Sequence, residues 1–220
     1  MPRTARASVG GICYHVLNRG NARAEVFHDL TDYRAFLALL KEAGARVPMR
    51  VLGFCLMPNH FHLVLWPRAE GDLSRYLQWL LTSHVRRYHR RYRSSGHVWQ
   101  GRFKAFPIEE DAHLLTVLRY VERNPLRARL VKRAENWRWS SLSRPKAGFI
   151  HESPVPLPRN WVARVNAHET ATELAALRNS VNRATPFGSP TWVTRTAKRL
   201  GLEASLRPRG RPRKAVAPEK

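Results

Sequence analysis

Acidic residues are scarce in this chain of 220 residues: Asp and Glu number 16, against 39 Lys and Arg, and the net charge is +23. So basic a surface attracts polyanions, which favours nucleic acid as the partner and leaves an anionic membrane surface as the alternative. Long apolar runs are also missing, since no stretch reaches the length that crosses a bilayer. No long basic amphipathic helix stands apart from the rest. We therefore expect a nucleic acid partner and no membrane partner.

Cysteine is limited to Cys13 and Cys55, which lie in strand-like runs and lack the C-x-x-C spacing of zinc sites. The pair therefore argues against a structural zinc ion and suits buried free thiols in a reducing compartment. The first residues include arginines but no apolar signal core. We expect a cytoplasmic, nucleoid-associated protein.

The chain has enough apolar material for a core, with 43% hydrophobic residues, seven Trp and eight Phe. Its length suits one domain with an extension. Composition shifts at a proline-rich stretch after residue 142 and again near the C-terminus. We expect a flexible basic lead-in over 1–10, a main domain over 11–142, a linker with accessory helices over 143–206 and a basic tail over 207–220.

The segment at 57–66, MPNHFHLVLW, predicts a buried β-strand that follows a Pro-Asn turn. Successive side chains of a strand point to opposite faces, so His60 and His62 share one face. Two imidazoles so placed can both reach one divalent ion. The alternative is two polar residues on the wet face of a sheet.

Other elements follow from periodicity and punctuation. A helix starting at Asp29 or Thr31 is expected to end at Gly44, and a second helix to start at Asp72 and stop before Gly96. Strands are expected over 11–18, 47–56 and 99–106. The first of these carries His15, for which a hydrogen-bonded sheet histidine is favoured over a further metal ligand.

Basic side chains gather at a few places that suit contact with phosphate. The far end of the second helix carries more arginines than its dipole needs, so a phosphate-binding face is favoured there. The tail contains an Arg-Gly-Arg-Pro core that resembles an AT-hook, with a generic electrostatic anchor as the equal alternative. The candidate DNA-binding residues are Arg19, Arg86, Arg87, Arg90, Arg91, Arg102, Lys104, Arg209, Arg211 and Arg213.

A helix is expected over 110–124, limited by Pro125. Tyr120 and Asn124 are four residues apart and so share one helical face. A phenol facing two metal-binding histidines could attack a phosphodiester, and the Asn124 carbonyl oxygen could be a third metal ligand. The alternative for Tyr120 is an ordinary half-buried core residue.

Four segments together resemble the REP-associated tyrosine transposases, which are single-tyrosine members of the HUH nuclease superfamily. These segments read YHVLNRGN, MPNHFHLVL, HVWQGRFK and RYVERNPLRA. The resemblance runs from about residue 11 to 142, and residues 186–214 are also similar. It assigns His60 and His62 to the HUH pair, Tyr120 to the nucleophile and Asn124 to the third metal ligand.

The resemblance implies an α+β fold, with a ferredoxin-like or RRM-like antiparallel sheet and helices on one face. The residues after 142 indicate a small helical, basic C-terminal extension. The resemblance also implies a transposase that cleaves and rejoins single-stranded DNA beside REP-type hairpins through a 5′-phosphotyrosine, with Mg²⁺ or Mn²⁺. A monomer is expected, with a dimer as the alternative. The competing function is a catalytically silent hairpin-binding protein; a water-dependent nuclease and an RNA-binding module are further alternatives.

Overall fold

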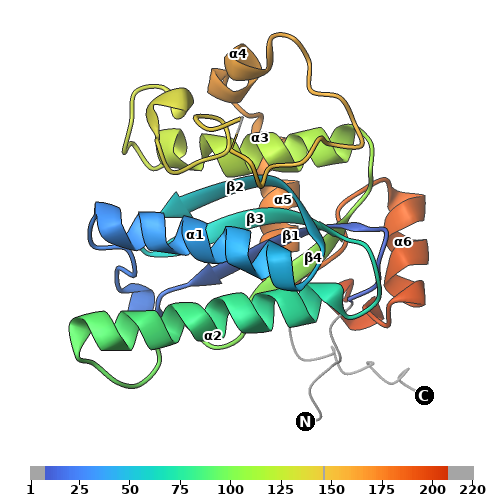
Figure 1. Cartoon of the computed structure of the whole chain (residues 1–220). Helices are drawn as coiled ribbons and strands as arrows, with labels where there is room; N and C mark the ends of the chain where they lie inside the picture. Colours follow the sequence, from blue (N-terminus) through green and yellow to red (C-terminus); the bar gives the residue numbers. More distant parts are fainter. Residues whose placement is uncertain (1–7, 146, 208–220) are drawn as a thin grey trace, which may run out of the picture.

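The computed structural model describes residues 8–145 and 147–207. Its centre is a four-stranded antiparallel sheet in the order β2-β3-β1-β4 (Figure 1). The strands are β1 (Cys13–Arg19), β2 (Met49–Met57), β3 (His60–Pro67) and β4 (Lys104–Ile108). The histidine strand is β3 and lies between β2 and β1. The order of strands and helices is that of a ferredoxin-like fold, which confirms the predicted α+β class.

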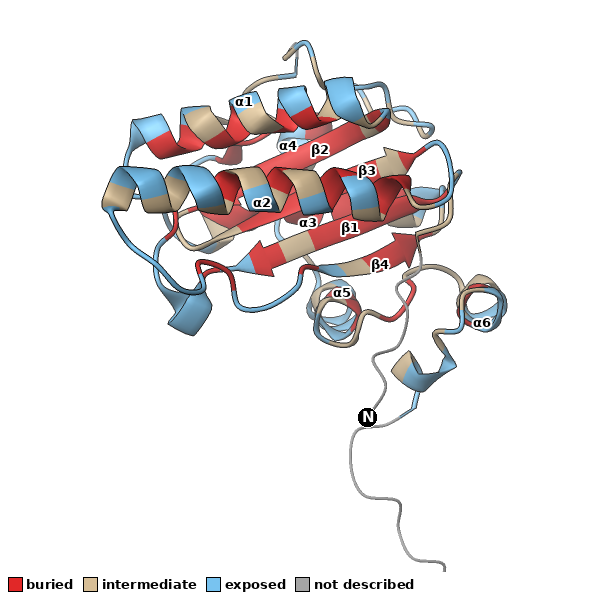
Figure 2. Cartoon of the chain, turned by 60° about the horizontal axis from the view of Figure 1, so that its bottom comes forward, coloured by how far each residue is buried: buried red, intermediate tan, exposed pale blue. Residues whose placement is uncertain are grey.

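Two long helices cover one face of the sheet, α1 (Leu30–Arg46) and α2 (Asp72–Tyr92) (Figure 2). The side chain of Asp29 caps α1 by accepting hydrogen bonds from the backbone N–H groups of Thr31 and Asp32. Both helices turn an apolar stripe toward the sheet, and there the side chains of Phe61, Leu63 and Leu65 meet them.

The opposite face of the sheet is covered by α3 (Ala112–Arg127), which packs mainly on β2. The expectation of helices on one face therefore holds for α1 and α2, and α3 adds a layer on the other. Because strand side chains alternate, His60, His62 and Val64 point away from α1 and α2. The histidines thus lie on the same side of the sheet as α3.

Three predicted boundaries were wrong. The strand expected over 99–106 begins only at Lys104, because Gly101 has a φ of +72° that breaks extended backbone. Gly44 does not end α1, since one glycine is tolerated inside a long, well-packed helix. Pro125 lies inside the last turn of α3, where the Ala128 N–H still donates to the Asn124 carbonyl oxygen.

The chain after α3 wraps back along the sheet. An irregular segment runs beside β2, where the His151 N–H donates to the Val51 carbonyl oxygen at 2.8 Å. The helices α4 (Trp161–Asn166), α5 (Ala171–Arg183) and α6 (Pro190–Arg199) follow, and α6 starts at a proline, whose fixed φ suits the first helical position. Trp161 and Leu177 are buried in the apolar cluster under α3. Short 3₁₀ turns occur at Asn21–Arg23 (η1), Ala134–Asn136 (η2) and Glu203–Ser205 (η3).

Candidate active site

His60 and His62 lie at the start of β3, directly after the turn at Pro58 and Asn59. Their ring centroids are 5.1 Å apart and their planes are nearly perpendicular. His62 is buried, while His60 is only partly covered. The predicted shared face is therefore present, and the two rings are close enough to serve one ion.

The proton position on His60 is set by its neighbour. The His60 Nδ1 atom lies 2.6 Å from the Asn59 Oδ1 atom, and since that oxygen can only accept, Nδ1 donates. The Nε2 atom then keeps a free lone pair. Burial, followed by the positive charges of Arg19 and Arg127, lowers the pKa of His60 to about 4, while Asn124 acts in the opposite direction. His60 is thus a neutral imidazole at physiological pH, the form that binds metals.

His15, on β1, forms a buried hydrogen bond with His62. The His15 Nε2 and His62 Nδ1 atoms are 2.8 Å apart and the rings are stacked. The interpretation of His15 as a hydrogen-bonded sheet histidine is therefore confirmed. Burial lowers the pKa of His15 to about 3 and holds that of His62 well below its ordinary value. Both rings are neutral, so one shared proton joins the two nitrogen atoms.

Tyr120 and Asn124 project from α3 toward these rings. The Tyr120 ring centroid is 5.8 Å from that of His62 and 6.1 Å from that of His15, in edge-to-face contact with both. Asn124, one turn further on, lies beside His60 and acts to raise its pKa. Each of the two α3 side chains is 8% exposed. The residues that the sequence singled out from two distant segments thus meet in one site.

The donor set fits a divalent ion. The free Nε2 atom of His60, the Nε2 atom of His62 and the carbonyl oxygen of Asn124 supply two nitrogen ligands and one oxygen ligand. Such a set leaves coordination positions for phosphate and water, and it suits Mn²⁺ or Mg²⁺. His62 joins it only in the arrangement in which its Nδ1 atom donates to His15, since Nε2 then carries no proton.

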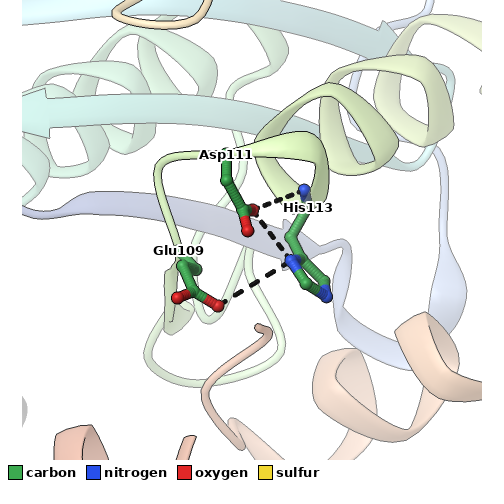
Figure 3. A group of neighbouring side chains, drawn as sticks. All are labelled: Glu109, Asp111 and His113. Carbon is green, nitrogen blue, oxygen red and sulfur yellow. Dashed lines mark hydrogen bonds and ion pairs between the residues drawn. The ribbon is translucent and has the colours of Figure 1, made fainter. Parts of the chain in front are cut away.

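A second group with metal-binding side chains lies where β4 passes into α3 (Figure 3). The ligand atoms of Glu109, Asp111 and His113 are within 4.8 Å of one another. The carboxylates already have structural partners, however. Asp111 caps α3 by accepting from the His113 N–H, and Glu109 accepts from the Ser189 N–H just before α6. This group therefore holds the helix ends in place.

The candidate DNA-binding residues divide into three groups. The exposed side chains are Arg19, Arg86, Arg87, Arg90, Arg102 and Lys104. Arg91 is exposed as well, but it forms ion pairs with Asp29 and Asp32, which link the start of α1 to the end of α2. Its contact with DNA stays a prediction. The tail candidates Arg209, Arg211 and Arg213 lie outside the described residues.

Sequence reasoning missed three arginines of α3. Arg119, Arg123 and Arg127 recur every fourth residue, so they form one stripe along the helix. The stripe faces the segment between α4 and α5, and Arg119 and Arg123 are each 8% exposed. The spacing was readable in the sequence, but the partner segment lies more than 40 residues further along the chain.

Comparisons with known proteins agree with this geometry. The family model described as "Transposase IS200 like" matches residues 8–124. A Haemophilus influenzae protein named as a REP-associated tyrosine transposase is 27% identical over 144 residues, which is 60% of this chain and 78% of that protein. The REP-associated tyrosine transposase of Escherichia coli is 22% identical over 156 residues, 71% of this chain and 87% of that protein.

Similarity extends to a solved structure. It is a REP-associated tyrosine transposase bound to a REP hairpin, with a TM-score of 0.56 at 18% identity, over 69% of this chain and 89% of that chain. This likeness supports the fold described above. The names of these relatives agree with the resemblance identified from the four sequence segments.

Proposed function

This chain belongs to the IS200-like transposase family, and from that premise we propose that it cleaves and rejoins single-stranded DNA beside a REP-type hairpin. A member of this family is a DNA-processing enzyme, so what must be argued is the chemistry. The observation that carries the proposal is the position of Tyr120, whose ring meets that of His62 while Asn124, one turn on, lies beside His60.

Tyr120 is the proposed nucleophile. Its phenol oxygen attacks the scissile phosphorus, a Tyr–O–P bond forms, and the bond from phosphorus to the 3′ oxygen breaks. The phenol proton leaves to solvent and the 3′ oxygen takes up a proton, which gives a 5′-phosphotyrosine and a free 3′-OH. The reverse attack by a 3′-OH rejoins DNA without an outside energy source, because the phosphodiester energy is kept in the tyrosine linkage.

His60, His62 and Asn124 are the proposed ligands of Mg²⁺ or Mn²⁺. When bound, the ion would act as a Lewis acid on the scissile phosphate and support departure of the 3′ oxygen. The protein contributes neutral imidazoles, whose low pKa values keep the lone pairs available without competition from protons. Asn59 orients the ring of His60 by contacting its Nδ1 atom, and His15 orients the ring of His62 in the same way.

The proposed partner is single-stranded DNA that carries a REP-like hairpin. Support comes from the net charge of +23 and from the exposed side chains of Arg86, Arg87 and Arg90, together with Arg19 beside His60 across the sheet. A structural relative is bound to a REP hairpin. No helix among the described residues could span a membrane. We propose that the protein acts as a monomer in the cytoplasm, on the nucleoid.

A covalent adduct tests the proposal directly. Single-stranded REP-like hairpins labelled at the 3′ end are incubated with Mn²⁺ and either the wild-type protein or Tyr120→Phe, then separated on a denaturing gel. A labelled protein–DNA adduct made by the wild type alone is expected. Cleavage by both proteins without an adduct would mean that water is the nucleophile. Binding without cleavage by the wild type would favour a silent hairpin-binding protein.

The metal assignment has its own control. His60→Ala and His62→Ala should abolish the adduct while hairpin affinity stays near wild type, because phosphate contacts supply most of that affinity. Asp111→Asn changes a carboxylate in the group of Figure 3 and keeps a residue that can cap α3. It should still form the adduct. If the histidine variants cleaved at the wild-type rate and Asp111→Asn did not, the ion would belong to the second group.

A further inference from the structure

The arginine stripe of α3 ties the accessory helices to the core. Arg119 donates to the carbonyl oxygens of Ala167 and His168, both at 2.8 Å. Arg123 donates to those of Val165 and Asn166 at 2.9 and 2.6 Å. These two side chains thus supply hydrogen-bond donors to the backbone carbonyl oxygens at the end of α4 and just after it. They act as structural anchors.

Arg127 differs from the other two because it also contacts the proposed nucleophile. The central carbon of its guanidinium lies 4.0 Å from the centroid of the Tyr120 ring. One nitrogen of the guanidinium points to the Tyr120 carbonyl oxygen at 3.4 Å, and the other forms an ion pair with Glu169 at 2.8 Å. The Arg127 side chain is 20% exposed, so part of it remains open to a ligand.

Glu169 reaches this position from the segment between α4 and α5. Its carboxylate pairs with Arg127 and lies 3.5 Å from Arg123, and its side chain is 10% exposed. A buried carboxylate between two guanidinium groups fixes their geometry through charge-assisted hydrogen bonds. The accessory segment therefore holds Arg127 in place over the Tyr120 ring.

The charge of Arg127 also reaches the histidines, since it lowers the pKa of both His60 and His62. Its contact with the ring of Tyr120 places it beside the proposed nucleophile. A phosphate placed for attack by Tyr120 must enter the same space. Guanidinium groups bind phosphate oxygens through two parallel hydrogen bonds and keep their charge at any physiological pH.

We propose that Arg127 is a further active-site residue that binds a non-bridging oxygen of the scissile phosphate, and that Glu169 is the residue that positions it. The inference rests on Tyr120 being the nucleophile. As the Tyr–O–P bond forms and the bond to the 3′ oxygen breaks, negative charge gathers on the non-bridging oxygens. A fixed guanidinium stabilises this charge more than that of the ground state. The accessory helices are then part of the catalytic centre.

Arg119→Gln is the matched control for Arg127→Gln, because both remove one anchor of the same segment from the same helix and only Arg127 touches Tyr120. For each variant we would measure the Kd for a REP-like hairpin without metal, the single-turnover rate of adduct formation with Mn²⁺ at saturating DNA, and the melting temperature. Arg127→Lys and Glu169→Gln complete the set. Arg127→Lys keeps the charge and the ion pair, so it carries the test if Arg127→Gln does not fold.

Arg127→Gln is expected to lower the saturated rate by about 10²- to 10³-fold, as loss of one oxyanion donor does, with the Kd within about threefold of wild type. Arg127→Lys should recover part of the rate, and Glu169→Gln should lose less of it. Arg119→Gln should change the melting temperature and leave the saturated rate near wild type. Equal rates for Arg127→Gln, Arg127→Lys and wild type would make Arg127 a structural anchor only. Absence of a Tyr120-dependent adduct in the wild type would instead overturn the proposed function, and this inference with it.

Discussion

The Nε2 atom of His15 lies 2.8 Å from the Nδ1 atom of His62, inside the sheet and away from solvent. Either nitrogen can carry the single proton between them. If His15 donates from Nε2, its Nδ1 atom carries no proton. The proton of His62 is then on Nε2, the atom that would bind an ion. If His62 donates, His62 Nε2 is free. Among the described residues, His15 Nδ1 has no partner in either case. An ion at His62 therefore selects the second arrangement.

His15→Phe should weaken Mn²⁺ binding, because His62 loses the acceptor that keeps its proton on Nδ1. The expected loss is about 10- to 100-fold, as for other groups that orient a metal-binding histidine. Free Mn²⁺ can be titrated by electron paramagnetic resonance, with no DNA present. His84→Phe is the control, since His84 is also buried among aromatic rings but lies on the α1–α2 side of the sheet. Equal losses in both variants would contradict the role of His15.

Asn124→Ala should also weaken Mn²⁺ binding, by about tenfold or more, because the site loses its proposed oxygen ligand. Isothermal titration calorimetry measures the change. Tyr120→Phe is the matched control from the same face of α3, since it removes only a hydroxyl group that is not a proposed ligand. An Asn124→Ala protein that binds Mn²⁺ like the wild type would remove Asn124 from the ligand set.

Replacing Arg86, Arg87 and Arg90 together with Gln should weaken hairpin binding and flatten its dependence on salt. Each lost phosphate contact lowers the slope of log K against log salt by about 0.7 to 0.9. Fluorescence anisotropy at several salt concentrations gives the slope. Arg91→Gln behaves differently: its ion pairs with Asp29 and Asp32 predict a loss of thermal stability with little change in slope. Slopes that fall equally for both proteins would argue against this division.

Glu122 should make the stability of the protein depend on pH. Burial raises the pKa of this carboxyl to about 7, although Ser141 and Trp161 donate hydrogen bonds to it at 2.6 and 2.7 Å. Between the unfolded pKa near 4.5 and pH 7, the folded state holds more protons, so its free energy of unfolding falls as pH rises. The loss is on the order of a few kcal/mol by pH 8.

Urea unfolding of the wild type and Glu122→Gln at pH 5, 6, 7 and 8 measures this effect. Buried histidines act in the opposite direction: a lowered pKa, such as that of His84 at about 4, makes stability rise with pH up to about 6.5. The difference between the two proteins removes that contribution. The wild type is expected to lose stability relative to Glu122→Gln as pH rises. A difference that does not vary with pH would mean that Glu122 titrates normally.

The parts of the site that could be predicted from the sequence depend on the repeat of side-chain directions within a single strand or helix. The alternation in a strand placed His60 and His62 on one face, and the helical period put Tyr120 and Asn124 one turn apart. Each rule needs only neighbouring residues, and the structure places all four side chains together. Their roles in catalysis remain predictions, as do the domain boundaries.

What the sequence could not supply depends on tertiary partners. Arg91 is exposed like its neighbours, and only the structure shows that it forms ion pairs with Asp29 and Asp32 at the start of α1. The late start of β4 depends on a positive φ at Gly101, which the letters WQGRFK do not reveal. The contact of Arg127 with Glu169 joins positions whose proximity arises only when the accessory helices fold back on α3.

The ligands proposed for the ion come from β3 (His60–Pro67) and α3 (Ala112–Arg127), elements that lie far apart in the sequence. An ion held by both would therefore cross-link the central strand to the helix that carries the nucleophile. Binding that is restricted to the folded state adds about 2.7 kcal/mol of stability at a hundredfold excess over Kd. The melting temperature of the protein would then rise with the fraction of molecules that bind the ion. In a cell poor in that metal the protein would be less stable as well as inactive.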